Sequence, residues 1–260
     1  MTKFVVIASG KGGTGKTTTA INLGTALSDF GRDVIVVDAN ITTPNVGLHL
    51  GMHSTQLTLH DALKGKKHIK EVVYSHPSGL KIIPAHISLD ESKGIKKEKL
   101  ADVIMGLAGA TDIVIIDTAT GFGDEMQNLI KSSDEMLIVT TPELAAITDA
   151  LKTIKLAEEN DASVIGIVLN RYSEEDIDMT VENIEKMLGK KILAVIPEDK
   201  HIKKSIKLKH PVIYAYPMSP SSVGFKKLAA RLIGEKYETD LEKKEKKKMF
   251  YYVLRKIGLR

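Results

Sequence analysis

The sequence predicts an α/β protein built on a mostly parallel sheet of seven to eight strands with helices on both faces. Seven short runs rich in β-branched residues recur along the 260 residues. Most of them are apolar throughout, as in strands that are covered on both faces. Segments of helix length separate most of these runs, which is the connection that parallel strands require. A glycine-rich loop follows the first run, and such sheets bind ligands at the carboxyl ends of their strands.

The strands are expected where the apolar runs lie, at residues 4–8, 34–37, 80–83, 113–116, 136–139, 164–169 and 192–196. The helices are expected at residues 16–30, 96–107, 125–131, 143–159, 175–188, around Ser205, and at 221–235. In the first helix, Ala20, Leu23 and Leu27 recur at helical spacing, and Gly31 ends the pattern. The chain shows no internal repeat and no low-complexity linker. We therefore expect one domain over residues 1–236, followed by a tail at residues 237–260.

Composition excludes several kinds of protein. The chain has no cysteine, which excludes disulfides and cysteine-ligated zinc or iron–sulfur centres. It has no run of about 18 apolar residues, and its first residues resemble a strand rather than a secretory signal, so we expect a cytoplasmic protein. Of the net charge of +4, residues 243–260 carry +7 and residues 1–242 carry −3. A partner attracted by positive charge is expected to meet the tail.

Residues 10–18 give the strongest functional signal. They read G-K-G-G-T-G-K-T-T and fit G-x-x-x-x-G-K-[ST], a loop whose backbone N–H groups surround a phosphate chain. Lys16 is expected to reach the terminal phosphates and the Thr17 hydroxyl to face Mg²⁺. Glycines are needed where the backbone approaches the anion closely or adopts a positive φ. The predicted nucleotide-binding residues of the loop are Gly10, Lys11, Gly12, Gly13, Thr14, Gly15, Lys16, Thr17 and Thr18.

Two aspartates come directly after apolar runs. Asp38 follows residues 34–37, and Asp117 follows residues 113–116. If these strands neighbour the first one, both carboxylates lie near the terminal phosphate, where a hard cation such as Mg²⁺ takes oxygen ligands. The alternative for each is an aspartate that begins a turn. We predict Thr17, Asp38 and Asp117 as the metal-binding residues.

These motifs and their flanks resemble those of the MinD/ParA family of P-loop ATPases. The form K-G-G-x-G-K-[ST], with Lys11 before two glycines, resembles that family's deviant phosphate loop. D-A-N at 38–40 with Asn45 downstream resembles its first switch, and D-T-A-T-G, which includes Thr120 and Gly121, resembles its second. L-N-R-Y at 169–172 and I-P-E-D at 196–199 are similar to its two adenine-side loops. Together with the tail, the resemblance favours the cell-division branch of the family over the DNA-segregation branch.

The resemblance implies a fold like that of the nitrogenase iron protein, binding of ATP with Mg²⁺, and a homodimer that holds two nucleotides between its subunits. Lys11 would reach the partner's ATP, as an arginine finger does; the alternative is a loop lysine that meets only solvent. The adenine-side residues would be Asn170, Arg171, Pro197, Glu198 and Asp199. Asn170 suits an adenine edge because a carboxamide both donates and accepts hydrogen bonds. Glu198 and Asp199 are equally consistent with a turn and an N-cap.

Asn40 departs from the family pattern, which usually has a second aspartate there, associated with the attacking water. An amide retains the shape but cannot hold a negative charge. The residues that the resemblance assigns to catalysis are Lys11, Lys16, Asp38, Asn40 and Asp117. Phosphoryl transfer depends mainly on positioning and electrostatics, so we expect slow hydrolysis and a long-lived ATP-bound dimer.

The tail combines an apolar stripe with cationic residues. On a helix, Met249, Phe250, Val253, Leu254 and Ile257 share one face, and Lys247 and Lys248 precede or flank them. This is the composition of a helix that lies in a lipid interface, and it resembles the family's C-terminal membrane-targeting helix. The alternative is a solvated tail that folds back on the body or stays disordered. We expect these residues to bind an anionic membrane surface.

The sequence thus favours a peripheral-membrane ATPase switch on the inner face of the cell membrane, which positions partner proteins and responds to a protein activator. The alternative is a partitioning ATPase for chromosomes or plasmids that binds DNA nonspecifically. DNA binding needs exposed basic residues; Lys203, Lys204, Lys207 and Lys209 favour it, whereas the acidic balance of residues 1–242 opposes it. The absence of cysteine excludes a metal-cluster reductase or scaffold, and Lys11 disfavours a small-molecule kinase.

Overall fold

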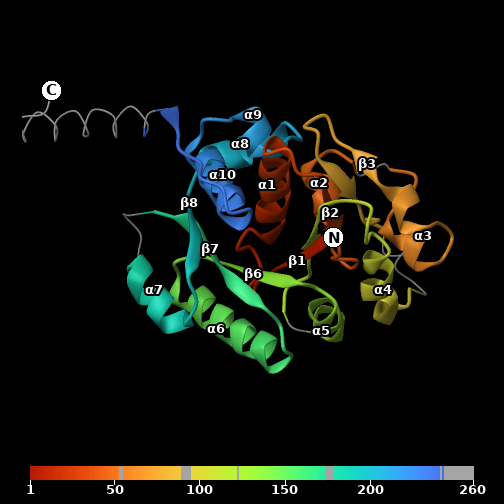
Figure 1. The fold of residues 1–260 in the computed structure, drawn as a ribbon, viewed down its shortest axis with the longest axis horizontal. Coiled ribbons are helices and arrows are strands. Elements are labelled where there is room, and N and C mark those ends of the chain that lie inside the picture. The colour runs from red at the N-terminus through yellow and green to blue at the C-terminus, as the bar shows by residue number, and fades with distance from the viewer. Residues whose placement is uncertain (53–54, 89–94, 122, 174–178, 241, 243–260) are drawn as a thin grey trace, which may run out of the picture.

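The computed structural model describes residues 1–260 except 53–54, 89–94, 122, 174–178, 241 and 243–260. At its centre is an eight-stranded sheet with the order β3-β4-β2-β5-β1-β6-β7-β8 (Figure 1). The strands are β1 (Lys3–Ala8), β2 (Val34–Asp38), β3 (Tyr74–Ser75), β4 (Lys81–Ile83), β5 (Ile113–Asp117), β6 (Glu135–Thr140), β7 (Val164–Tyr172) and β8 (Ile192–Pro197). Neighbouring strands are parallel except at one edge, where β3 runs antiparallel to β4.

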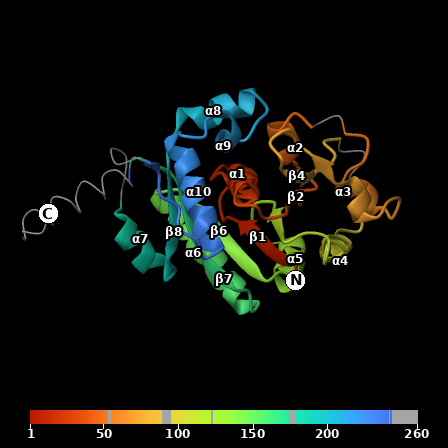
Figure 2. The ribbon, with the colours of Figure 1, turned by 45° about the horizontal axis from the view of Figure 1, so that its top comes forward.

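Helices cover both faces of the sheet (Figures 1 and 2). They are α1 (Lys16–Asp29), α2 (Val46–His49), α3 (Leu59–Leu63), α4 (Leu100–Met105), α5 (Asp124–Lys131), α6 (Leu144–Glu159), α7 (Val181–Leu188), α8 (Lys200–Lys207), α9 (Val212–Ala215) and α10 (Pro220–Leu232), with 3₁₀ turns η1 (Ile69–Val72) and η2 (Lys97–Lys99). Phe4 and Val6 of β1 belong to the core that contains α3 to α7, whereas Val5 and Ile7 belong to the core that contains α1, α9 and α10. Because side chains alternate along a strand, burial on both faces requires a continuous apolar run.

Helix α1 lies close against the sheet because its middle carries a glycine. A Cβ on Gly24 would stand 2.7 Å from Cγ2 of Val36 and 3.0 Å from Cδ1 of Leu80. Both distances are shorter than van der Waals contact, so a side chain here would push the helix away from β2. The close packing fixes the amino end of α1 relative to the ends of the central strands.

The central strands end together at the edge of the sheet that faces the glycine-rich loop. Asp38, the last residue of β2, is in register with Asp117, the last residue of β5. Asp117 is also in register with Ile7 of β1, one residue before that strand ends. The loop that follows β1 therefore begins beside Asp117, whereas Asp38 lies one strand further away, because β5 separates β2 from β1. Of the two strands expected to neighbour the first, only β5 does so.

The predicted fold class is confirmed, and the structure corrects its details. The two-residue antiparallel strand β3 was not predicted, because two residues show no periodicity. The same holds for the four- and five-residue helices α2, α3 and α9. The expected helix at 96–107 is a 3₁₀ turn followed by α4. The described part of the helix expected at 175–188 begins at Val181, after the N-cap Thr180, whose side chain accepts a hydrogen bond from the Asn183 amide.

The chain beyond α10 folds back along that helix as far as the structure describes it. The ring of Tyr237 contacts that of Phe30, the C-cap of α1, edge to face with 6.1 Å between the ring centres, and Nζ of Lys227 in α10 lies 2.6 Å from Oε1 of Glu242. The division at residue 236 stays a prediction. The predicted membrane-binding residues Lys247, Lys248, Met249, Phe250, Val253, Leu254 and Ile257 lie outside the described residues. Among the described helices, none is long and apolar enough to cross a membrane.

Candidate functional site

The glycine-rich loop joins β1 to α1 and is held in place from β7. Gly13 and Gly15 have φ angles of 80° and 96°, where a side chain would be strained. A Cβ on Gly15 would also collide with the side-chain amide nitrogen of Asn170. Asn170 donates a hydrogen bond from Nδ2 to the Thr14 carbonyl at 2.7 Å. Glycine at position 15 therefore permits the contact through which β7 fixes the loop.

Lys16 lies buried at the start of α1. Its ammonium donates hydrogen bonds to Oγ of Ser9 at 2.8 Å and to Oγ1 of Thr120 at 3.0 Å. Burial lowers the pKa of Lys16, and the nearby Asp117 carboxylate partly offsets this effect. The lysine thus connects the end of β1 with the second switch, and a phosphate anion would meet a cation that has already lost much of its hydration.

Asp117 and Thr17 form the second polar contact at this edge. Thr17 donates a hydrogen bond from Oγ1 to Oδ2 of Asp117 at 2.6 Å. The other carboxylate oxygen, Oδ1, is buried and has no hydrogen-bond partner among the residues that the structure describes. Burial raises the pKa of Asp117 to about 6, although the Thr17 hydrogen bond and the Lys16 charge act in the opposite direction. A buried carboxylate oxygen without a partner is a ready ligand for a cation.

Asp38 is fully buried and holds the first switch. Its Oδ2 accepts hydrogen bonds from the backbone amides of Asn45 and Val46, both at 2.9 Å, and Oδ1 accepts one from the Asn40 amide at 3.3 Å. Burial raises the pKa of Asp38 well above its ordinary value, and the Asp117 charge raises it further against these three hydrogen bonds. Asp38 therefore tethers the amino end of α2 next to Asp117.

Asn40 is engaged in a turn of the first switch. Its Nδ2 donates to the Thr43 carbonyl at 2.7 Å, and its Oδ1 accepts from the amide and the hydroxyl of Thr43, both at 3.1 Å. Such an Asx turn uses the donor and the acceptor of the carboxamide. Asn45 closes the same segment by donating from Nδ2 to the Thr43 carbonyl at 2.9 Å.

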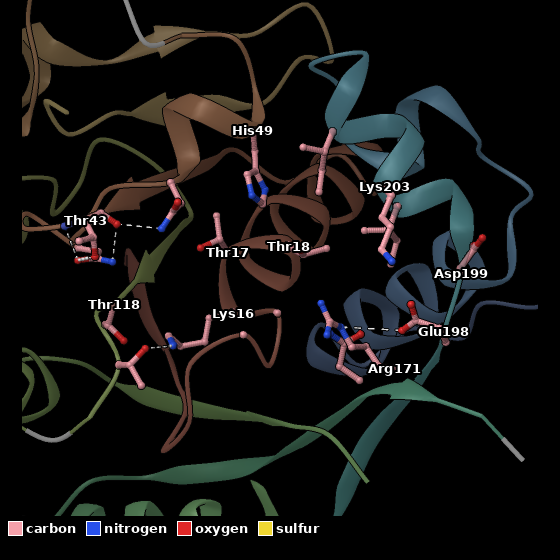
Figure 3. Close-up of a pocket in the computed structure, with 18 residues that line it drawn as sticks. Lys16, Thr17, Thr18, Thr43, His49, Thr118, Arg171, Glu198, Asp199 and Lys203 are labelled. Carbon is pink, nitrogen blue, oxygen red and sulfur yellow. Dashed lines mark hydrogen bonds and ion pairs between the residues drawn. The ribbon is translucent and has the colours of Figure 1, made fainter. Parts of the chain in front are cut away.

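A pocket of about 360 Å³ lies beside the loop and extends between α2 and α8 (Figure 3). The predicted residues that line it are Gly13, Gly15, Lys16, Thr17, Thr18, Asn40, Asn45, Thr120, Asn170, Arg171, Glu198 and Asp199. The sequence did not single out Thr43 and His49 at one side or Ile202 and Ile206 at the other. Gly10, Lys11, Gly12, Thr14, Asp38, Asp117, Gly121 and Pro197 adjoin the pocket in sequence but are not among its lining residues.

The end of the pocket away from Lys16 is formed by β7, β8 and α8. Arg171 has a φ of 56°, and its Nε lies 3.9 Å from Oε2 of Glu198. The pair is half exposed at the rim (Figure 3). Oδ1 of Asn170 is buried and has no hydrogen-bond partner within the described part of the chain, so this acceptor is available between this end and the loop. A base with an amino group would satisfy that acceptor.

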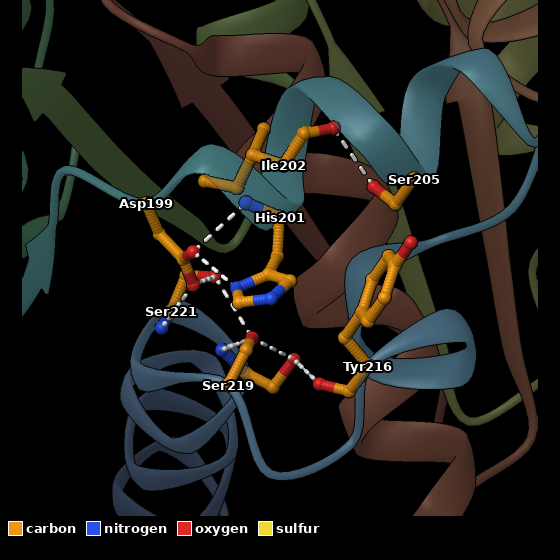
Figure 4. Close-up of polar contacts among 8 residues, drawn as sticks. Asp199, His201, Ile202, Ser205, Tyr216, Ser219 and Ser221 are labelled. Atoms are coloured by element: carbon orange, nitrogen blue, oxygen red, sulfur yellow. Dashed lines mark hydrogen bonds and ion pairs between the residues drawn. The ribbon is translucent and has the colours of Figure 1, made fainter.

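Asp199 serves mainly as a helix cap (Figure 4). Its Oδ1 accepts hydrogen bonds from the amide and Nδ1 of His201, at 2.9 and 2.7 Å. Its Oδ2 accepts from the amide of Ser221 at 3.1 Å and from the hydroxyl of Ser221 at 2.6 Å. Burial opposes ionisation, but these hydrogen bonds outweigh it and lower the pKa of Asp199 to about 2. One carboxylate thus ties the amino ends of α8 and α10 together behind the base end of the pocket.

Lys11 points away from the pocket that its own loop forms. Its Nζ lies 3.0 Å from Oε2 of Glu143, the residue before α6, and the two side chains are 42% and 63% exposed. Gly10, its neighbour, lies against the backbone of Asp149 in α6, where a Cβ would collide with the Asp149 carbonyl. Gly121 of the second switch has a φ of 96°.

The site fits a nucleoside triphosphate with Mg²⁺. The loop amides, the buried Lys16 and the amino end of α1 form an anion-binding cradle. Oδ1 of Asp117 beside the Thr17 hydroxyl supplies hard oxygen donors of the kind that Mg²⁺ prefers. Oδ1 of Asn170, which has no partner among the described residues, can accept a hydrogen bond from the amino group of a base. Lys16, Thr17 and Asn170 all line the pocket, and Asp117 adjoins it through its hydrogen bond with Thr17.

Comparisons with known proteins agree with this geometry. The family described as "ParA: NUBPL iron-transfer P-loop NTPase" matches residues 1–233. An uncharacterized ATP-binding protein of Methanocaldococcus jannaschii is 41% identical over 241 residues, which cover 93% of this chain and 91% of that protein.

Two solved structures extend the comparison. The septum site-determining protein MinD of Pyrococcus horikoshii OT3, complexed with Mg-ADP, is 34% identical and has a TM-score of 0.84 over 89% of this chain and 96% of that one. MinD in the MinC:MinD cell division protein complex of Aquifex aeolicus is 29% identical, with a TM-score of 0.81 over 92% and 98% of the two chains.

Proposed function

Since this chain belongs to the MinD/ParA family of P-loop ATPases, we propose that it is an ATP-gated dimeric switch that binds an anionic membrane surface and positions partner proteins. ATP closes two subunits face to face, and the closed dimer presents two tails to the inner face of the cell membrane. Slow hydrolysis, stimulated by a protein activator, then separates the subunits. The family and the site support binding and hydrolysis of ATP; the dimer, the membrane and the partners are the proposal.

The direction of Lys11 carries the dimer proposal. A lysine in a phosphate-binding loop ordinarily serves the anion in its own pocket, yet Lys11 does not line that pocket and reaches Glu143 instead. Its side chain is partly exposed and can be reached by a second subunit. A cation supplied in trans stabilises the charge that develops during phosphoryl transfer. Lys11 therefore supports a site that is completed by the partner.

The residues of the chain's own pocket divide the remaining work. Lys16 and the loop amides bind and orient the terminal phosphates, and Asn170 orients the base. Thr17 and Asp117 hold Mg²⁺, which neutralises phosphate charge during transfer. Asp38 adds negative charge beside them and keeps α2 in place through the Asn45 and Val46 amides.

The first switch supports slow hydrolysis. Asn40 cannot take up a proton from water as a carboxylate can, and the donor and the acceptor of its amide are used by Thr43. The chain thus lacks a carboxylate at the position that the family associates with the attacking water. We infer that positioning and electrostatic stabilisation drive the reaction without a carboxylate at position 40, so that the ATP-bound dimer persists until an activator intervenes.

The tail sequence supports membrane binding that depends on the dimer. A single lipid anchor binds only marginally, with an association constant on the order of 10⁴ M⁻¹ for one acyl chain. Basic residues near anionic lipid add about 1 kcal/mol each. Two linked tails gain roughly 10²- to 10⁴-fold in avidity without a new contact. ATP would therefore control membrane residence through the number of tails that act together.

Light scattering tests the dimer. With MgATP we expect the mass to rise from 28.4 kDa to twice that value, and with MgADP we expect it to stay at 28.4 kDa. Lys11→Ala should bind MgATP yet remain a monomer. Lys152→Ala, which removes a lysine of α6 that is 70% exposed, is the matched control and should dimerise. A wild-type protein that binds MgATP and stays monomeric would overturn the switch.

Vesicle sedimentation tests the membrane. Phosphatidylglycerol vesicles should pellet the full chain with MgATP, and a chain ending at Glu242 should remain in the supernatant. Equal pelleting of both chains would overturn the anchor. The alternative, DNA binding, is supported by exposed lysines of α8 at positions 200, 203, 204 and 207. A salt-dependent DNA mobility shift by the shortened chain, without vesicle binding by the full chain, would replace the membrane proposal.

A further inference from the structure

His49 lies in the wall of the pocket, at the carboxyl end of α2. In Figure 3 its imidazole stands on the same side as Thr17 and Thr18, which begin α1, and away from Arg171 and Glu198 at the base end. Phosphate groups bind at the amino ends of helices that follow such loops. His49 is partly buried, and no hydrogen bond to its ring occurs among the described residues. Its ring nitrogens are therefore available to a ligand.

Helix α2 is attached at both ends, so His49 is held where it lies. At its start, Asp38 accepts hydrogen bonds from the backbone amides of Asn45 and Val46. At its end, Nζ of Lys209 donates to the Leu48 carbonyl at 3.0 Å. The Lys209 side chain also packs over Gly51, where a Cβ would lie 3.1 Å from Cβ of Lys209. The helix thus joins the phosphate end of the pocket to the segment that follows α8.

The charges around His49 are mostly positive. Lys209 approaches from the segment after α8, Lys203 lines the pocket from α8 itself, and Lys16 lines it from the start of α1. Arg171, Glu198 and Asp199 line its base end, and Asp38 lies behind α2, which brings no charged residue other than the histidine. Burial lowers the pKa of His49, and the Lys209 charge lowers it further. The imidazole is therefore neutral at pH 7 in the protein without nucleotide.

We propose that His49 binds the phosphate chain of the nucleotide as a hydrogen-bond donor and takes up a proton when it does so. The inference rests on the proposed function only in requiring that the pocket bind ATP. A bound polyphosphate brings several negative charges to a side chain that otherwise faces lysines. Opposite charge favours the protonated imidazole, and a charged donor binds an anionic oxygen more strongly than a neutral one does. His49 is thus a contact that the phosphate-loop motif does not include.

The sign of the pH dependence follows from linkage. The nucleotide raises the pKa of His49 in the complex above its value in the free protein. Affinity therefore increases as the pH falls below the pKa of the complex, and it levels off below the pKa of the free protein. Each unit that separates the two pKa values is worth about tenfold in affinity. Above the pKa of the complex, the affinity is independent of this group.

Calorimetric titration with MgATP at pH 6, 7 and 8, in buffers of different ionisation enthalpy, tests the inference. Because Asp117 also titrates in this range, the measured quantity is the ratio of wild-type affinity to His49→Gln affinity, which should rise as the pH falls from 8 to 6, and wild type should take up more protons at pH 7 than this variant does. His49→Gln keeps a neutral donor and should lose the His49-dependent part of both effects. His86→Gln, a histidine outside the pocket, should match wild type. Inorganic triphosphate should show the same His49-dependent uptake, and adenosine should show none.

The outcomes separate this inference from the proposed function. If wild type binds MgATP and His49→Gln shows the same pH profile and the same proton uptake, the inference is overturned while the ATPase stands. A loss of affinity in His49→Gln that is equal at every pH, with unchanged proton uptake, assigns His49 a packing role and also overturns it. A wild-type protein that does not bind MgATP overturns the proposed function itself. Thermal melting of both variants verifies that they fold.

Discussion

Replacing Asp117 by Asn should stabilise the protein without nucleotide and at the same time abolish its response to Mg²⁺. Burial raises the pKa of Asp117 from 3.8 to about 6. A group whose pKa is higher in the folded state favours folding when protonated, and this advantage is lost as the pH rises through the folded pKa. Two pKa units correspond to about 3 kcal/mol. At pH 7 the ionised Asp117 therefore lowers the free energy of unfolding by roughly that amount, which an amide does not do.

The magnitude depends on pH in a way that identifies the cause. Integrating the proton linkage between the two pKa values gives a gain for Asp117→Asn of about 1.5 kcal/mol at pH 5 and about 3 kcal/mol at pH 7.5. The Thr17 hydroxyl can still donate to the amide oxygen, whereas the amide nitrogen takes the buried Oδ1 position, which has no partner among the described residues. That unpaired donor reduces the gain by the same amount at every pH, so the difference between the two pH values, about 1.5 kcal/mol, identifies the titration. Asp102→Asn changes an exposed carboxyl on α4 and serves as the control.

Urea denaturation in the presence of a chelator measures the gain in the free energy of unfolding. The same experiment with MgATP measures how much ligand-induced stabilisation the variant has lost. Wild type should be stabilised by MgATP, whereas Asp117→Asn should respond much less because it lacks the ionised oxygen that faces the cation. A variant that is less stable than wild type at pH 7.5 without ligand would refute the reasoning. So would a gain of equal size at pH 5 and pH 7.5.

Three further changes probe other parts of the site. Gly15→Ala adds a Cβ at a residue with a φ of 96°, and this Cβ collides with Asn170. Calorimetry should find no MgATP binding, and denaturation should show that the free energy of unfolding falls by about 1–3 kcal/mol. An unchanged affinity for MgATP would mean that the loop relaxes around the new side chain. Asn40→Asp should raise the rate of single-turnover ATP hydrolysis severalfold. An unchanged rate would show that the Asn40 amide is not the cause of slow hydrolysis. Ser221→Ala removes the hydroxyl that donates a 2.6 Å hydrogen bond to Oδ2 of Asp199 and should lower the free energy of unfolding by about 1–3 kcal/mol. Ser205→Ala removes a hydroxyl that donates to the Ile202 carbonyl of its own helix and should lower the free energy of unfolding by less. An equal decrease in both variants would show that the Asp199 cap contributes no more than an ordinary helix hydroxyl.

The sheet was predictable because its strands are buried on both faces and therefore carry uninterrupted apolar sequence. The meeting of Asp38 and Asp117 followed from the same reasoning, since parallel strands end at one edge, and the two residues are indeed in register. Strand β3 and helix α2 were not predictable, because a few residues leave no period to detect. The end of β7 was also missed. It continues to Tyr172 through Arg171, whose positive φ interrupts the pattern of a regular strand.

The sequence does not show which residues far apart in the chain are hydrogen-bond partners. Nothing in the local pattern shows that Asp199 is bound to Ser221, which lies 22 residues further along the chain. The same holds for the contact of Lys209 with Leu48 across 161 residues, and that contact gives His49 its place in the pocket. A lone histidine on a four-residue helix has no motif, so only its position beside α1 identifies it.

The pairing of Lys11 with Glu143 has a consequence for how fast two copies can associate. Both side chains are open to water, and an ion pair of this kind contributes less than about 1 kcal/mol. Detaching the lysine therefore adds almost nothing to the activation barrier of an encounter, and moderate salt reduces even that small resistance. In the proposed dimer, Lys11 would therefore exchange the Glu143 carboxylate for the phosphates of the partner's nucleotide at almost no energetic cost.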